Sequence, residues 1–287
     1  MQMILVLQNI YITTLKNIGV NLSYNFNFHL SFKPETSHMS EFLKYKFENE
    51  TKENIGRRLG IATGSSSGKV VPMMLYCAAA NLISYTANNQ LYSVEQTTLG
   101  NYIKEIDPSL ESYDVKTFIH YNFCTFNSKM TVWELLFRQF ASHYKCFSRS
   151  VFLTHISDKY QTKIYNKSIT PVIKTYIDDG LLTDLNILTQ CKKDKYEFGR
   201  IRIVQNSAKW YAFYLYDFLK RLDSTKRDFH LSDLKSNGFH SIFGWNGDDL
   251  FAVMDILENN GYICMDKQYN DTYFTIYDLV TDNIVIK

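Results

Sequence analysis

The chain has 287 residues, with 31 Lys and Arg against 29 Asp and Glu, 45% hydrophobic residues and 15% aromatic residues. This composition excludes disordered, collagen-like and low-complexity proteins, because it supplies enough apolar side chains for a packed core. The formal charge of +2 does not indicate a globally basic nucleic-acid binder, so nucleic-acid binding would require a local basic patch.

Alternating apolar residues predict one strand in an N-terminal lead over residues 1–39 (Phe26, Phe28, Leu30, Phe32). Beyond the lead we predict an α+β, mainly helical fold of tandem winged-helix-like (helix-turn-helix) units with short wing strands. The first unit, with connecting helices, covers residues 40–130, a basic second unit covers 131–208, and an acidic third unit covers 209–287. In each unit an Asn or Gly, which tolerates the left-handed backbone, ends the longest helix, and an apolar pair then enters a strand. These three markers are Asn81-Leu82-Ile83, Gly180-Leu181-Leu182 and Gly261-Tyr262-Ile263.

Helices are predicted in chain order from apolar spacing and capping residues. The first unit has helices at 41–48, 52–59 and about 69–81, the last capped by Ser66 or Ser67, and then a strand through Leu91, Tyr92 and Val94. The second has helices at 131–142, from a Ser148 cap to near Lys159, and from an Asn166 or Ser168 cap to Asp179 with Pro171 in the first turn. The third has helices at 209–222, 230–236 and 248–259, and then wing strands with Tyr269, Tyr273, Phe274 and Tyr277.

Charge is segregated along the chain. Residues 138–174 carry seven cations against one anion, and residues 248–287 carry two cations against eight anions. This polarity suits a protein that contacts nucleic acid through its middle and another protein through its end, although solvated faces would give the same pattern.

A helix from about Ser168 to Asp179 in the second unit could lie against a DNA groove while nearby lysines meet phosphates. Arg57, Arg58 and Lys69 offer a smaller basic cluster in the first unit. The candidate nucleic-acid-binding residues are therefore Arg57, Arg58, Lys69, Lys159, Lys163, Lys167 and Lys174. A basic solvated turn between core helices is the competing interpretation.

Candidate catalytic and metal sites are weaker. The loop from Gly64 to Lys69 departs from a phosphate-binding P-loop, which needs a Gly where Thr63 stands and Ser or Thr where Val70 stands. Two pairs spaced for one side of a helix or turn could converge on zinc, but their apolar flanks also suit a core (His120, Cys124, His143, Cys146). We predict no catalytic residue, no metal and no cofactor.

The five cysteines form no C-x-x-C pair, and their odd number would leave one thiol unpaired in a secreted disulfide framework (Cys77, Cys124, Cys146, Cys191, Cys264). A reducing compartment is the simpler interpretation. The N-terminal residues do not resemble a signal peptide, and no apolar run approaches the roughly 18–20 residues of a membrane helix. We expect a cytoplasmic protein without a membrane partner.

Several runs resemble a bacterial family called domain of unknown function 4007. They are Leu59-Gly60-Ile61, Gly68-Lys69-Val70-Val71, Leu82-Ile83, Thr98-Leu99-Gly100, Asp107-Pro108-Ser109-Leu110-Glu111, Thr117-Phe118, His120-Tyr121, Thr131-Val132-Trp133 with Phe137, Phe229–Leu234 and Phe243-Gly244-Trp245. The family's opening histidine-glutamate-threonine-phenylalanine is reduced here to Glu35-Thr36, and its glycine-lysine-asparagine becomes Gly68-Lys69-Val70.

Members of that family tend to be encoded beside phosphoadenosine-phosphosulfate-reductase-like proteins in DNA phosphorothioation and phage-defence islands. The resemblance therefore implies DNA modification or restriction, without assigning a reaction. We predict a non-catalytic DNA-binding or adaptor subunit of such a system, with DNA and a partner protein as its partners. The alternatives are a pure protein-interaction scaffold and a metal-dependent nuclease built around Asp107, Asp114 and Lys116.

Overall fold

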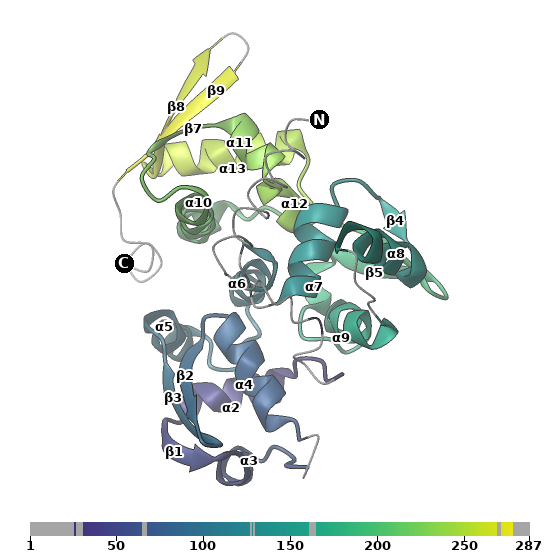
Figure 1. Cartoon of the computed structure of the whole chain (residues 1–287). Coiled ribbons are helices and arrows are strands. Elements are labelled where there is room, and N and C mark those ends of the chain that lie inside the picture. Colours follow the sequence, from purple (N-terminus) through teal and green to yellow (C-terminus); the bar gives the residue numbers. More distant parts are fainter. Residues whose placement is uncertain are drawn as a thin grey trace, which may run out of the picture.

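The computed structural model describes residues 26, 31–64, 68–126, 128, 130–160, 165–268 and 271–277 (Figure 1). In these ranges the chain is α+β and mainly helical, with three antiparallel sheets of three strands each. The coarse fold class is therefore confirmed. Of the residues used for sequence predictions, Phe28, Leu30, Ser66, Ser67, Lys163 and Tyr269 lie outside the described part.

The first sheet has the strand order β1-β3-β2, and the same stretch of chain contains three helices. The elements are α2 (Thr36–Lys44), β1 (Phe47–Thr51), α3 (Lys52–Leu59), α4 (Val70–Ala79), β2 (Ile83–Asn88) and β3 (Leu91–Gln96). The predicted helices over 52–59 and 69–81 are confirmed to within two residues. The helix predicted over 41–48 instead ends at Lys44, because Phe47 pairs with Val94 as part of β1.

Two helices, α5 (Thr98–Ile106) and α6 (Tyr113–Cys124), lead from this sheet into the second one. The second sheet has the order β4-β6-β5. Its elements are α7 (Thr131–Trp133), η1 (Glu134–Phe140, a π-helix), β4 (Cys146–Phe147), α8 (Arg149–Tyr160), α9 (Asn166–Tyr176), η2 (Thr183–Leu185), β5 (Leu188–Lys192) and β6 (Lys195–Phe198).

The third sheet has the order β7-β9-β8. A 3₁₀ turn, η3 (Gln205–Ser207), precedes it, and the remaining elements are α10 (Ala208–Leu222), β7 (Asp228–His230), α11 (Leu231–Ser236), α12 (Phe239–Ile242), α13 (Gly247–Asn259), β8 (Ile263–Gln268) and β9 (Asp271–Ile276). The three helices predicted for this region are confirmed to within one residue at each end.

Two of the three predicted helix-ending markers are confirmed. Asn81 and Gly261 have φ values of 58° and 73°, and each directly precedes the residues that enter a strand. The prediction for Gly180 is wrong, because Asp178 holds the left-handed conformation after α9, at φ 53°. Apart from Gly, Asp is one of the few residues that adopt this conformation, because its short polar side chain can form local hydrogen bonds. Pro171 is the sixth residue of α9, beyond the first turn in which it was predicted.

Helix α6 lies at the centre of the molecule, with the three groups of elements around it (Figure 1). One hydrophobic cluster extends from Met39 to Ile276 through all three groups. Within it, His120 of α6 is fully buried and bonds two other helices, through Nδ1 to the Tyr176 hydroxyl at 2.7 Å and through Nε2 to the Ile242 carbonyl at 2.6 Å. Burial lowers the pKa of His120 to about 4, so this joint contains a neutral imidazole.

The segments that follow β6 and α12 also cross at close range, and so they join the second and third groups of elements. A Cβ on Gly244, where φ is 67°, would lie 2.2 Å from the carbonyl oxygen of Gly199. The Ile201 amide donates to the Phe243 carbonyl at 2.9 Å beside this crossing. Only a residue without a side chain permits this approach.

None of the described helices has both the length and the apolar character that a membrane-spanning helix requires.

Candidate nucleic-acid interface

When α7 and η1 are counted as one continuous helix and the short η2, η3 and α12 are left out, the order of elements around each sheet is the same: helix, strand, helix, helix, strand, strand. In each case the last long helix is followed by the hairpin, but the surfaces of these helices differ. Helix α4 has an apolar sequence with six buried residues, α9 has one buried and one lysine-bearing face, and α13 begins with Asp248 and Asp249. These three helices therefore cannot make the same contacts.

Helix α9 presents a lysine-bearing face to solvent. Lys167 and Lys174 are exposed and seven residues apart, which places them on one side of the helix. Ile169, Val172 and Ile173 are buried on the other side. The Lys167 ammonium lies 5.6 Å from the ring centroid of Tyr165, which is 50% exposed. Lys167 and Lys174 are therefore the predicted basic residues that the structure describes on this helix, and both are exposed.

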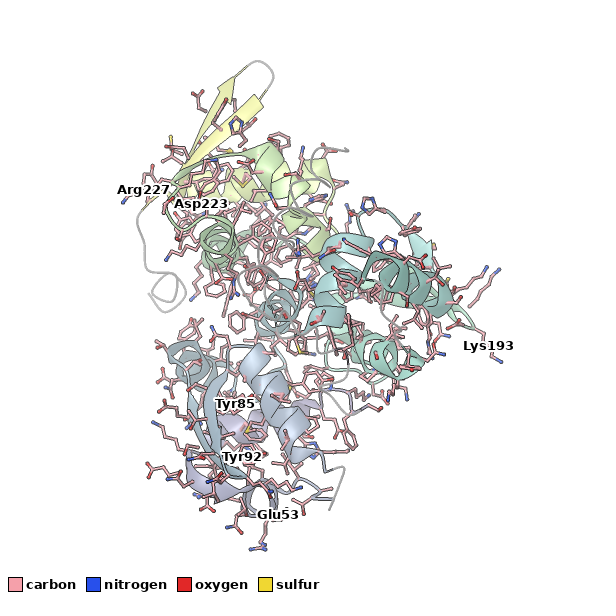
Figure 2. All side chains as sticks on the ribbon, in the orientation of Figure 1. Glu53, Tyr85, Tyr92, Lys193, Asp223 and Arg227 are labelled. Carbon is pink, nitrogen blue, oxygen red and sulfur yellow. The ribbon has the colours of Figure 1, made fainter. Side chains whose placement is uncertain are left out.

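The hairpin of β5 and β6 adds three cations that the sequence analysis missed. Lys192, Lys193 and Lys195 are exposed, and the turn between the strands places Asp194 at φ 55°. Lys193 lies at the outer edge of the molecule, pointing away from its body (Figure 2). In the sequence these cations form the run Lys192-Lys193-Asp194-Lys195, which lies outside the basic segment at residues 138–174.

Several cations of the predicted basic segment are instead engaged within the protein. Lys159 donates to Gln139 Oε1 at 2.7 Å, and desolvation together with the nearby Arg138 lowers its pKa. Arg138 forms an ion pair with Glu134. Arg149 lies 3.2 Å from Asp194 and also donates to the Tyr196 hydroxyl, and Lys145 lies 3.5 Å from Glu197. The local charge that a ligand meets is therefore smaller than the sequence count.

The first predicted cluster is divided by its contacts. Lys69 donates to Glu35 Oε1 at 2.7 Å, so an ion pair occupies its ammonium. The Arg58 guanidinium lies 4.9 Å from the Tyr45 ring centroid, and Arg57 is exposed on α3. Arg57 and Arg58 lie in the last turn of α3 and Lys69 caps α4, so these cations do not share one exposed helix face as Lys167 and Lys174 do.

The two predicted zinc pairs have different environments. His120 and Cys124 are buried, with Cys124 Sγ 3.7 Å from His120 Nδ1, whereas His143 and Cys146 are exposed. Both imidazole nitrogens of His120 already have the partners described above. Among the described residues, no three His, Cys, Asp or Glu side chains are grouped to hold a metal ion. The core interpretation of His120 and Cys124 thus fits their surroundings.

The three residues of the nuclease hypothesis have separate structural partners. Asp107 accepts hydrogen bonds from Ser112 and Glu111 amides at 2.8 and 3.1 Å; burial opposes its ionisation, but these bonds lower its pKa overall. Asp114 accepts from the Ser207 hydroxyl at 2.7 Å. Lys116 forms an ion pair with Asp184. These contacts account for all three side chains as parts of turns and junctions.

The acidic segment is also partly engaged. Asp249 completes the capping box of α13 with Asn246 and lies 3.2 Å from Arg200. Asp255 lies 3.3 Å from Lys267, and Glu258 accepts from the Met265 amide at 2.7 Å. Asp248 is exposed at the start of α13. Since α13 carries carboxylates on its outer side, it would repel the phosphate backbone that α9 could attract.

Comparison with known proteins places the fold near one solved protein. No family model and no curated protein matches the sequence. A crystal structure described as magnesium ion-bound SspB matches with a TM-score of 0.72 and 15% identity, covering 88% of this chain and 83% of that chain. A second crystal structure of SspB matches with a TM-score of 0.70, at the same identity and coverage. The chain therefore shares the fold of SspB over most of its length.

Proposed function

We propose that this chain is a non-catalytic DNA-binding or adaptor subunit of a bacterial DNA-modification or phage-defence system. DNA contacts the second unit through a basic surface, which we define as Lys167 and Lys174 of α9 with Lys192, Lys193 and Lys195 of the β5–β6 hairpin. The observation that carries the proposal is the exposure of all five lysines on α9 and on the hairpin of the same unit.

The repeated element order supports a winged-helix interpretation of each unit. In this interpretation α9 is the helix that enters or faces the groove, and the hairpin is the wing that reaches a neighbouring phosphate. Lysines suit such contacts, because neutralising phosphates releases counterions and gives affinity without base recognition. The units thereby have distinct roles: the apolar α4 belongs to the core, and the acidic α13 faces away from DNA.

The adaptor part of the proposal concerns the third unit. Its carboxylates disfavour nucleic acid and favour a basic surface on a partner protein. Membership of the domain of unknown function 4007 family, and with it a place in phosphorothioation or phage defence, remains part of this proposal. The shared fold with SspB supports a relationship between the two proteins but carries no activity from one to the other.

DNA binding should be measured by fluorescence anisotropy on a labelled duplex at several salt concentrations. The test variant replaces Lys167, Lys174, Lys192, Lys193 and Lys195 with Ala. A control with the same loss of charge replaces five exposed lysines elsewhere, namely Lys44, Lys46, Lys104, Lys220 and Lys267. Each phosphate contact contributes about 0.9 to the slope of log affinity against log salt. We expect the test variant to lose most of this slope and the control to keep it.

Equal affinities of the two variants would contradict the assignment of the surface. Absence of binding by the unmodified protein, to both phosphorothioated and ordinary duplex, would favour the scaffold alternative. A preference for the phosphorothioated duplex would connect the basic surface to the modification itself.

A further inference from the structure

A polar cleft with a volume of about 410 Å³ opens where α6, η2 and the segment after β6 meet. None of the five lysines of the basic surface lines it, and its walls come from three separate parts of the chain. Three cations and two anions line it together with one aromatic ring: Lys116, Arg200, Arg202, Glu111, Asp184 and Tyr113. The ionised side chains lining the cleft therefore leave a net charge of +1.

Arg202 is held in place by an aromatic ring. Its backbone amide donates to the Tyr113 hydroxyl at 2.8 Å, and its guanidinium carbon lies 4.3 Å from the centroid of the Tyr113 ring. Contact with the ring face orients a guanidinium while leaving N–H groups at its edges. In the described part of the chain no carboxylate forms an ion pair with this guanidinium. Arg202 is thus a positioned donor fork at the cleft.

The other two cations are only partly satisfied. Lys116 has a side chain that is 13% exposed and pairs with Asp184, whose own side chain is 65% exposed. Arg200 uses Nη1 to reach both carboxylate oxygens of Asp249 at 3.2 Å, which leaves its remaining N–H groups for another acceptor. An anion entering the cleft could therefore receive hydrogen bonds from three cationic side chains while Asp184 turns toward solvent.

We infer that this cleft binds a phosphate group. Guanidinium forks match the oxygens of a phosphate in pairs, and two such forks line this cleft beside a lysine. The group belongs either to a free phosphate compound or to the backbone of a nucleic acid. This inference goes beyond the proposed function, because none of its residues belongs to the basic surface on α9 and the hairpin.

The test uses the full chain and two probes, inorganic pyrophosphate and a DNA duplex, each titrated by calorimetry. Arg202→Gln removes the donor fork, and Arg200→Gln, at a side chain that is 64% exposed, removes a second cation that lines the cleft. Arg227→Gln is the matched control at an exposed arginine on another part of the molecule (Figure 2). Thermal melting of each variant checks that folding is retained.

We expect Arg202→Gln and Arg200→Gln each to weaken pyrophosphate binding on the order of tenfold, as the loss of a charge-assisted hydrogen bond predicts. A free phosphate compound as ligand gives this result. If pyrophosphate does not saturate but both variants lower DNA affinity and its salt slope, the ligand is a backbone phosphate. Binding of both probes that is unchanged from the Arg227→Gln control overturns the inference.

The two proposals fail separately. Loss of DNA binding in the five-lysine variant with intact pyrophosphate binding supports both sites as independent. Pyrophosphate binding that depends on Arg202 in a protein that never binds DNA would retain the phosphate site and reject the basic surface.

Discussion

The second and third units have the same order of elements but opposite surface charge. Helix α9 and the following hairpin expose five lysines, whereas α13 begins with Asp248 and Asp249 and carries Asp255 on its exposed side. Packing explains why both versions fold, because each helix buries only its apolar face. Here the repeated fold specifies the position of a surface, and a few exposed residues decide what that surface can bind.

Reversing the charge of the second hairpin should remove the difference between the two units and have the largest effect. Under the proposed function, replacing Lys192, Lys193 and Lys195 with Glu turns three phosphate attractions into repulsions. We expect DNA affinity to fall by on the order of 10²–10³ at low salt, because each of the three ammonium groups would otherwise neutralise a phosphate. Anisotropy measures this fall, and a variant that still binds as tightly as the unmodified chain would place the DNA elsewhere.

The joint between the units should be sensitive to His120. Substitution of His120 by Leu leaves the Tyr176 hydroxyl and the Ile242 carbonyl buried without their partner, at a cost of about 3 kcal/mol in the free energy of unfolding. Urea unfolding measures this change. The same substitution at exposed His143 serves as control and should cost less than about 0.5 kcal/mol. Similar costs at both positions would show that the imidazole bonds contribute nothing.

The same histidine predicts a pH dependence. His120 has a pKa of about 4 in the folded protein and a value near 6.5 when unfolded, so the unfolded chain takes up the proton first as the pH falls. Stability is therefore fully present above about pH 6.5 and decreases toward pH 4, by up to about 3 kcal/mol. The free energy of unfolding, measured by urea at several pH values across this window, should depend less steeply on pH for His120→Leu than for the unmodified protein. An equal slope in both proteins would mean that His120 does not titrate this way.

Removing one carboxylate from the third unit should have the smallest effect. Asp255 and Lys267 have side chains that are 52% and 60% exposed and lie 3.3 Å apart. Exposed pairs of this kind contribute about 0.5 kcal/mol or less, so Asp255→Asn should leave unfolding almost unchanged. DNA affinity should also change by less than about twofold, because the third unit faces no phosphate in our proposal. A large gain in affinity would bring α13 close to the DNA.

Local patterns predicted several of the helices better than the sheets. Helices α3, α10 and α13 carry regular apolar spacing and recognisable ends, so their bounds could be predicted closely. Strands β1, β4 and β7 were missed because they have two to five residues and pair with strands far along the chain, as Phe47 does with Val94. A strand this short has no recognisable local sequence pattern, because its formation depends on a partner strand far along the chain.

The candidate site was predicted in part for a related reason. Exposure of Lys167 and Lys174 follows from the amphipathic pattern of α9, and the hairpin lysines could have been added from the turn residues around Asp194. Ion pairs such as that of Lys69 with Glu35 join residues 34 positions apart, and that of Arg149 with Asp194 joins residues 45 apart. Tertiary packing therefore determines which cations are already neutralised, and a count of charges along the chain cannot identify them.

The backbone crossing of Gly199 with Gly244 and the buried contacts of His120 have a consequence for geometry. They join the second and third units through packed atoms instead of a tether, so the angle between the two surfaces is set. Under the proposed function, a protein docked on the third unit would then meet DNA at one rotational position around the double helix. Its access to a chosen site should rise and fall with spacing, with a period of about 10 base pairs, the length of one turn of DNA.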